Sequence, residues 1–284
     1  MVSAAAVGGG PSLEDQVASL IGSWLWLLGC LGLLGTVLLH RAWTRWGVAP
    51  RPRLRETPLW RGIDLVFFLA VYVLLMIPVT SVGGLLGLDD AAGMLIAFVL
   101  WNGSVALGIV FFVRRVLGQP LAALGLRGAS ARHVTLVVLL NAVTFVPILL
   151  IHGAWLLFLS WLGSEGPRQE TVELFRSSVQ ENRVGAMLSL TASAVVAAPL
   201  CEEIIFRGFF FGMLRPRWGF TPAALFSSAV FALLHGTLSV FVPIFVVGVC
   251  LAYVYERTGS LYLSILYHGL FNGAHLLLLV VAPL

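Results

Sequence analysis

The chain has 284 residues, of which 59% are hydrophobic and only 11% are charged, and its mean hydropathy is +0.98. Soluble domains carry about a quarter charged residues, so this composition excludes an ordinary soluble domain and predicts a polytopic membrane protein. The net charge is +4 and every basic residue is an arginine. The arginines lie in short loops between apolar runs, a pattern that indicates orientation in a membrane and argues against nucleic-acid binding.

Eight apolar runs are long enough to cross a bilayer, which takes about 20 helical residues. They lie at residues 17–39, 63–87, 92–113, 133–163, 185–214, 221–239, 240–255 and 260–282. The sequence therefore predicts an all-α protein of about eight transmembrane helices, with its active site enclosed in the helical bundle. The first run follows no basic segment, so we expect a retained helix and not a cleaved signal peptide.

Glycine and proline refine this picture. The first predicted helix has three glycines at a spacing of three, which indicates close packing against another helix: Gly29, Gly32 and Gly35. Pro147 predicts a kink in the fourth helix. Gly236 and Pro243 predict a tight turn between the sixth and seventh helices.

The loops alternate in charge. Arginines dominate the loops after the first, third and fifth runs, whereas acidic residues dominate after the second and fourth. The positive-inside rule then predicts that odd-numbered loops are cytoplasmic and that both termini lie on the outer side. A single cysteine placed at Asp89 should accordingly be labelled from outside.

Two adjacent glutamates, Glu202 and Glu203, interrupt the fifth apolar run. A carboxylate in hydrocarbon costs at least a few kcal/mol and marks a candidate functional site. Glu203 lies four residues before Arg207, the favourable order for a helical ion pair. Glu202 points about 100° away, free to bind or activate another group. The alternative interpretation is that both carboxylates serve structural ion pairs.

Histidines in the later helices are the natural partners of these carboxylates. His268 and Asn272 are four residues apart and share a helix face, while His235 ends the sixth run. At 1.5 Å per residue, Glu202 and His235 lie about 18 and 20 Å from the same membrane face, so they can meet. His268 is shallower, at about 12 Å, so its helix must tilt or begin deeper. Alone, each histidine would be interpreted as a core residue or a helix cap.

Three motifs in this region resemble those of the CPBP family, the CAAX proteases and bacteriocin-processing enzymes also called the Abi family, which includes the type II CAAX prenyl endopeptidases. The motifs are Glu202-Glu203-x-x-x-Arg207, Phe231-x-x-x-His235 and His268-x-x-x-Asn272. The resemblance makes residues 131–284 the catalytic core and residues 1–130 an N-terminal part of the same integral membrane unit.

The resemblance implies an intramembrane endopeptidase. In it, Glu202 and His235 would hold and activate the attacking water, while His268 and Asn272 would stabilise the oxyanion. The Glu203–Arg207 pair would support the site. Peptide hydrolysis does require a base for water and donors aimed at the developing oxyanion.

Zinc is the open alternative for this chemistry. Two histidines and a glutamate form a catalytic zinc set, which here would be Glu202, His235 and His268. The chain has no HExxH pairing, and these ligands would come from three helices. We therefore favour a mechanism without a cofactor, with Zn²⁺ as the alternative.

The expected partners are membrane lipids and a peptide or membrane-protein substrate, either lipidated or bacteriocin-like. The arginine-only, Ala-, Gly- and Leu-rich composition is typical of a GC-rich bacterium and favours the inner membrane. Two other functions are compatible with the same residues. A proton-coupled transporter also uses intramembrane Glu and His, although the sequence lacks an inverted repeat. A non-proteolytic scaffold or immunity protein could share the fold.

Overall fold

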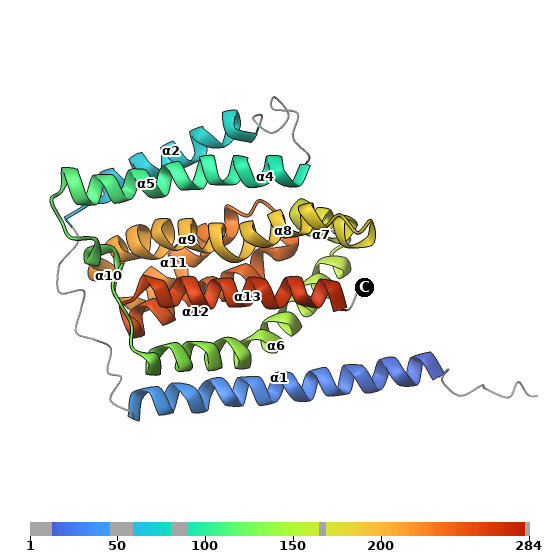
Figure 1. Cartoon of the computed structure of the whole chain (residues 1–284). Coiled ribbons are helices and arrows are strands. Elements are labelled where there is room, and N and C mark those ends of the chain that lie inside the picture. The colour runs from blue at the N-terminus through green and yellow to red at the C-terminus, as the bar shows by residue number, and fades with distance from the viewer. Residues whose placement is uncertain (1–12, 46–58, 81–89, 165–168, 282–284) are drawn as a thin grey trace, which may run out of the picture.

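A computed structural model describes residues 13–45, 59–80, 90–164 and 169–281. Within these ranges every regular element is a helix, which confirms the predicted all-α fold (Figure 1). Asp89, the position chosen for labelling, lies outside the described residues, so the predicted sidedness stays a prediction.

The α-helices are α1 (Leu13–Arg45), α2 (Gly62–Thr80), α4 (Asp90–Phe98), α5 (Ser104–Phe111), α6 (Ala131–Trp161), α7 (Glu170–Gln180), α8 (Val184–Ala192), α9 (Ala198–Glu203), α10 (Gly212–Trp218), α11 (Phe220–Leu233), α12 (Leu238–Thr258) and α13 (Leu261–Val281). Four π-helical segments and one 3₁₀ turn complete the order: η1 (Val99–Gly103), η2 (Phe112–Val116), η3 (Leu121–Leu124, 3₁₀), η4 (Ser193–Ala197) and η5 (Ile204–Phe211).

Several of these segments join into continuous rods. Segments α4 to η2 form one, and α8 to α10 form another. Six helices in the described ranges are long and apolar enough to cross a membrane, and α2 and α11 contribute shorter apolar helices. Each of the eight predicted runs therefore corresponds to a helix, and the protein is a multi-pass integral membrane protein.

The boundary between the sixth and seventh helices differs in part from the prediction. Gly236 does form the turn, with a φ of 71°. Pro243, however, lies inside α12, which begins at Leu238 and not at residue 240. Without an N–H, Pro243 leaves the carbonyl of Ser239 without its regular helical donor, and the helix nevertheless continues through it.

The short length of α11 places its end at membrane depth. Its 14 residues span about 21 Å, less than the bilayer's hydrocarbon core of about 30 Å. The chain then turns and enters α12. His235 follows two residues after the end of α11, so a helix of this length that starts at one membrane surface ends short of the other.

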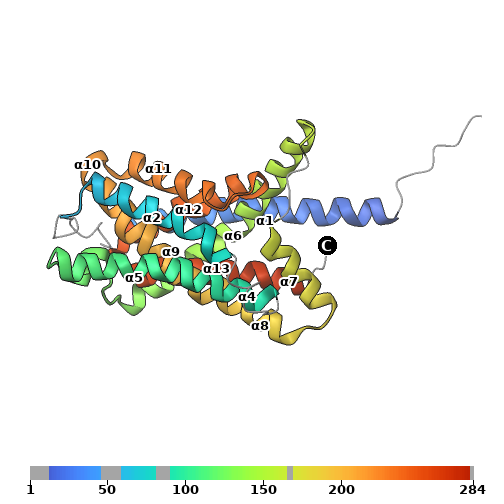
Figure 2. The same cartoon turned by 90° about the horizontal axis from the view of Figure 1, so that it is seen from above.

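Close packing joins the first helix to the fourth, as the glycine spacing predicted. A Cβ atom on Gly32 would lie 2.5 Å from the carbonyl oxygen of Val143 in α6. Figure 1 shows α1 running beside α6 at the outer face of the bundle. Pro147 lies within α6, and the bend of this helix is visible in Figures 1 and 2, in agreement with the predicted kink.

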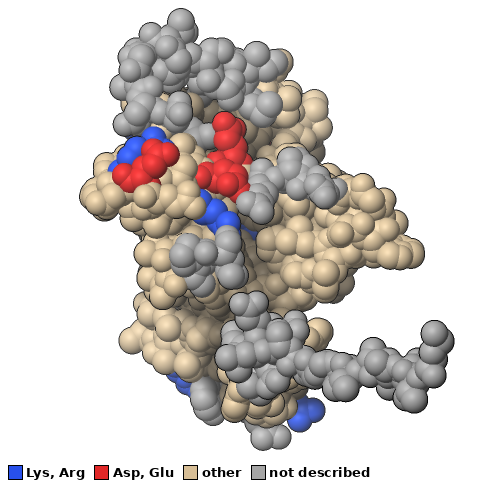
Figure 3. All heavy atoms as spheres, turned by 90° about the vertical axis from the view of Figure 1, so that its right-hand side faces the viewer, with Lys and Arg blue, Asp and Glu red and all other residues tan. Residues whose placement is uncertain are grey.

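The two ends of the bundle differ in charge. The α5–α6, α10–α11 and α12–α13 connections share one end in Figure 1, where Arg114, Arg115, Arg215 and Arg217 lie near helix ends. Figure 3 looks at the opposite end and shows acidic side chains there next to arginines. The first turn of α7 carries Glu170 and Glu173. The loops at residues 46–58 and 81–89 lie outside the described residues, so the predicted alternation of loop charges stays a prediction.

Helix α13 approaches the rod α8–α10 closely at Gly269. A Cβ atom there would lie 2.6 Å from the carbonyl oxygen of Val195 in η4. We expect Gly269→Ala to destabilise the protein by about 1–3 kcal/mol, because backbone must move to admit the methyl group. The thermal unfolding midpoint of detergent-purified protein measures this.

Gly153→Ala is the matched control. Gly153 is also helical, in α6, but no atom would lie within 4 Å of its Cβ, so alanine should be neutral or slightly stabilising. Equal midpoints for the two variants would contradict the close approach.

Candidate active site

Glu203 lies at the centre of the site and is fully buried. Its Oε1 accepts hydrogen bonds from Arg207 Nη1 at 3.0 Å and His268 Nδ1 at 3.0 Å, and its Oε2 accepts one from Ser264 Oγ at 2.6 Å. The Glu203–Arg207 pair expected from the i, i+4 spacing is therefore present. One carboxylate joins η5 and α13, two elements far apart in the sequence.

Arg207 extends this network to two more helices. Its Nη2 donates to the carbonyl of Gly248 in α12 at 3.3 Å. Its guanidinium lies 4.3 Å from the centre of the Phe231 ring in α11, within cation–π range. Gly248 makes this possible, since a Cβ there would lie 2.8 Å from Ser228 on α11. The buried charge is thus compensated from several sides.

Glu202 faces away from this network. Its side chain is nearly buried, and Oε2 has no hydrogen-bond partner in the described part of the chain. The nearest basic group is His268, whose Nε2 lies 3.8 Å from Oε2, beyond hydrogen-bond distance. Glu202 lines a cavity of about 140 Å³, which we call the glutamate cavity. The two carboxylates therefore occupy different environments, as their angular separation predicted.

His235 lines the same cavity as Glu202. The two side chains therefore come together, as their predicted depths in the membrane indicated. Its Nδ1 lies 2.8 Å from the carbonyl oxygen of Phe231. A carbonyl only accepts, so Nδ1 carries the hydrogen and donates, which leaves the lone pair on Nε2. The imidazole is half-buried and its ring packs edge-on against Phe231. The helix end thus presents a proton acceptor beside a carboxylate.

His268 lies between the two glutamates and is buried. The sequence placed it too shallow unless its helix tilts or begins deeper. The structure nevertheless brings His268 to both glutamates. At the start of α13, Ser260 and Leu261 are buried, and the Leu261 N–H donates to the carbonyl of Gly125 at 2.7 Å.

Asn272 has a different environment from the other motif residues. Its Nδ2 donates to the carbonyl of Ala194 in η4 at 2.8 Å, and it is not among the residues that line the glutamate cavity. In a π-helix this carbonyl would accept from the residue five positions on, which is Pro199 and has no N–H. Asn272 supplies the missing donor and fastens α13 to the rod.

Two residues of the N-terminal part also line the glutamate cavity, Tyr72 in α2 and Asn102 in η1. The Tyr72 hydroxyl donates to Asn102 Oδ1 at 3.1 Å, and Asn102 is completely buried. Neither residue was predicted from the sequence. The signal for Asn102 was available, because it is a lone amide in an apolar run, just as the glutamates are lone carboxylates.

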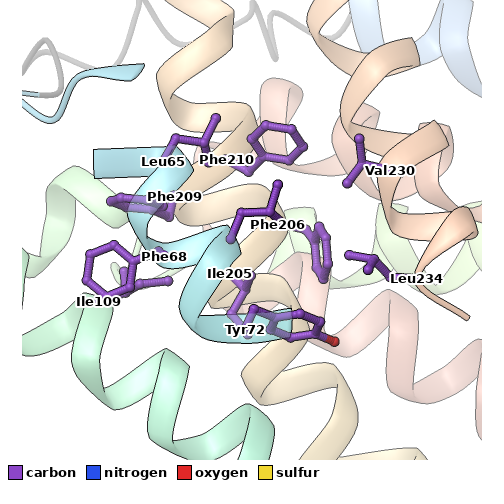
Figure 4. A pocket seen from close by; sticks show the side chains of 11 residues that line it. Leu65, Phe68, Tyr72, Ile109, Ile205, Phe206, Phe209, Phe210, Val230 and Leu234 are labelled. Carbon is purple, nitrogen blue, oxygen red and sulfur yellow. The ribbon is translucent and has the colours of Figure 1, made fainter. Parts of the chain in front are cut away.

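An apolar pocket adjoins the glutamate cavity and shares Tyr72, Phe206 and Leu234 with it. Figure 4 shows this pocket between α2 and η5, with Leu65, Phe68 and Phe209 toward its other end and the tyrosine hydroxyl at its edge. Tyr72 therefore presents its ring to the apolar pocket and its hydroxyl to the polar cavity.

A metal site is the remaining question of geometry. In residues 13–45, 59–80, 90–164 and 169–281, no three His, Cys, Asp or Glu side chains converge as a metal cluster. The zinc set of Glu202, His235 and His268 does not form such a cluster. Nδ1 of His268 bonds to Glu203, which leaves Nε2 as its open ring nitrogen. The mechanism without a cofactor stays a prediction.

Comparison with known proteins supports the resemblance over the part of the chain that holds the site. Residues 184–274 match the family model "Type II CAAX prenyl endopeptidase Rce1-like", and this segment contains all three motifs. A curated relative from Bacillus subtilis (strain 168), "Putative membrane peptidase YdiL", is 34% identical over 85 residues. That match covers 30% of this chain and about a third (34%) of the relative's length. No solved structure matches the chain.

The ion pair at the centre of the site predicts a specific stability effect. We expect Arg207→Leu to destabilise the protein by about 3–5 kcal/mol, because it leaves the Glu203 carboxylate buried without its cation. The matched control is Arg215→Leu, which breaks a shorter pair with Glu256 at 2.6 Å that is partly exposed. That loss should be about 1 kcal/mol or less.

Thermal unfolding of both variants in detergent distinguishes the two pairs. A larger drop in the midpoint for Arg215→Leu than for Arg207→Leu would contradict the central role of the buried pair.

Proposed function

We propose that this protein is an intramembrane endopeptidase in which Glu202 and His235 activate a water molecule for attack on a peptide bond. One observation carries the proposal: a nearly buried carboxylate without a partner on Oε2 lines a cavity together with an imidazole whose Nε2 lone pair is free. A structural carboxylate in a membrane would be expected to have a partner, and Glu203 next to it has three.

The cavity suits a water between the two side chains. A buried water needs polar partners and about 15 Å³ of space open to its centre, and the glutamate cavity provides about 140 Å³ on this measure. Glu202 and the Nε2 of His235 are both acceptors, so each can take one of the water's hydrogens. The oxygen lone pairs then point toward the substrate carbonyl, and Glu202 takes the proton as the new C–O bond forms.

His268 is proposed to stabilise the charge that develops on the substrate. Its Nδ1 donates to Glu203, so the other nitrogen faces Glu202. When protonated, it balances the second carboxylate and can donate to an oxyanion. The oxyanion role that the resemblance gives Asn272 stays a prediction. The hydrogen bond from Asn272 to Ala194 supports at least an indirect role, since it fixes α13 one turn beyond His268.

The proposed substrate is a peptide with an apolar group next to the scissile bond. The apolar pocket beside the glutamate cavity is lined by leucine, isoleucine, valine and aromatic side chains, which suit a hydrocarbon group. The matched family is named for prenylated CAAX peptides, so a prenylated peptide is the first substrate to test.

Cleavage of a quenched farnesylated CAAX peptide by detergent-purified protein tests the proposal. We expect Glu202→Gln and His235→Ala each to lower kcat by about 100-fold or more, the usual size of a general acid–base contribution. Because Glu202 Oε2 has no partner, Glu202→Gln should unfold at the wild-type temperature. The unlipidated peptide serves as the substrate control.

Full activity in Glu202→Gln would overturn this assignment. Ion flux in proteoliposomes without any cleavage would instead favour a transporter, and peptide binding unaffected by either variant would favour a scaffold.

Metal content tests the mechanism separately. We expect active protein to retain its turnover after dialysis against a strong zinc chelator, since the ligand set does not converge. Elemental analysis of the same sample measures bound zinc. Stoichiometric zinc whose removal abolishes turnover, and whose return restores it, would show that the metal-free mechanism is wrong.

A further inference from the structure

The wall of the glutamate cavity formed by α2 and η1 contains a polar pair that no motif covers. Tyr72 and Asn102 lie more than eighty residues before the matched segment 184–274, yet they line the same cavity as Glu202 and His235. Asn102 is completely buried, with an accessibility of 0%. Burying an amide costs free energy unless its C=O and N–H groups are hydrogen-bonded. The partners of each group therefore matter.

The hydrogen bonds fix which way the amide points. Oδ1 accepts from the Tyr72 hydroxyl at 3.1 Å, and Nδ2 donates to the carbonyl of Phe98 at 3.4 Å. A carboxamide nitrogen carries two hydrogens. No acceptor in the described part of the chain takes the second one. One N–H of an amide that lines the cavity therefore has no partner in the described part of the chain.

Tyr72 is itself held in place. Its backbone carbonyl accepts from Trp101 Nε1 at 2.6 Å, and the two rings pack with their centres 4.6 Å apart. The tyrosine ring also packs against Phe206 of η5. The hydroxyl that orients Asn102 is thus fixed by the same aromatic cluster that closes the cavity.

The two asparagines near the site differ in what they can donate to. Nδ2 of Asn272 is bound to the carbonyl of Ala194, and Asn272 does not line the glutamate cavity. Asn102 lines it, with an amide hydrogen unclaimed. A donor for a developing oxyanion must point into the space where the substrate carbonyl lies.

We propose that Asn102 is a catalytic residue that donates a hydrogen bond from Nδ2 to the oxyanion, and that Tyr72 is the positioning residue that holds the amide in this orientation. The proposal rests on the proposed endopeptidase function. In the step it serves, the water oxygen bonds to the carbonyl carbon and the C=O π electrons move to oxygen. The water proton passes to Glu202, which later protonates the leaving nitrogen as the C–N bond breaks.

Steady-state cleavage of the farnesylated peptide by the full-length protein tests the role of Asn102. We expect Asn102→Ala to lower kcat by about 100-fold, the usual effect of losing one oxyanion donor, with KM changed by less than about twofold because the bond forms only in the transition state. Tyr72→Phe should lower kcat about fivefold, the effect of one ordinary hydrogen bond, again without a change in KM.

Asn141→Ala is the matched control. Asn141 is a buried asparagine in α6 whose Nδ2 also donates to a backbone carbonyl, that of Tyr267, but it does not line the glutamate cavity. We expect it to lower the unfolding temperature while leaving kcat within about twofold of wild type. This separates loss of a buried hydrogen bond from loss of a catalytic donor.

A second readout does not depend on turnover. A phosphonamidate peptide carries a tetrahedral, charged oxygen at the reacting centre, and its Kd is measured by displacement of a fluorescent peptide. We expect Asn102→Ala to weaken it about 100-fold, matching kcat, while the affinity of the uncleaved peptide in a Glu202→Gln background stays within twofold.

The outcomes distinguish the two proposals. If the wild type cleaves the peptide and Asn102→Ala has the same kcat, the proposed role of Asn102 is overturned. The proposed endopeptidase function then still stands. An equal loss of affinity for peptide and phosphonamidate shows a structural role and also overturns it. A wild type that neither cleaves the peptide nor binds the phosphonamidate overturns the endopeptidase and, with it, this inference.

Discussion

The structure depends on one buried ion pair, Glu203 with Arg207. Two charges taken out of water are stable only when their remaining hydrogen-bonding groups are satisfied, and here three helices contribute the partners. Ser264 and His268 come from α13, the carbonyl of Gly248 from α12 and the Phe231 ring from α11. The pair therefore fixes the positions of three helices around η5. Because Glu203 already supplies the carboxylate of the ion pair, the neighbouring Glu202 is not needed for it and can face the cavity.

Departures from regular α-helix place the functional groups. Asn102 lies in the π-helical η1, and the π-helical η5 follows Glu203 directly, in keeping with the frequent occurrence of π-helical turns at functional sites. Pro199 leaves one carbonyl of η4 without its backbone donor, and Asn272 uses it to fasten α13. The early end of α11 holds His235 at the depth of the glutamates. Each irregularity costs local hydrogen bonding, and in each case a side chain or turn near the site makes use of it.

Much of this could be predicted from the sequence because the signals are local. Hydrophobic length gives the eight helices, i, i+4 spacing gives the Glu203–Arg207 pair, and the glycines of α1 give its contact with α6. The position of His268 beside both glutamates could not be predicted, since it depends on how the start of α13 packs. There the Leu261 N–H bonds to Gly125, over a hundred residues away. Asn102 was not predicted for a related reason. It is the one side-chain amide in residues 90–116, and nothing in this segment indicates which helix it faces.

The division of the glutamate cavity between two parts of the chain has a consequence for divergence. The carboxylates, both histidines and the ion pair come from residues 202–268, whereas the facing wall comes from α2 and η1. Substitutions on that wall change the shape of the cavity and of the apolar pocket beside it without touching the ion-pair network. A lineage of such proteins can therefore alter substrate preference through its first helices while the carboxylates, histidines and ion pair are preserved. A chimaera that exchanges α2 to α5 but keeps Tyr72 and Asn102 would transfer selectivity as a unit.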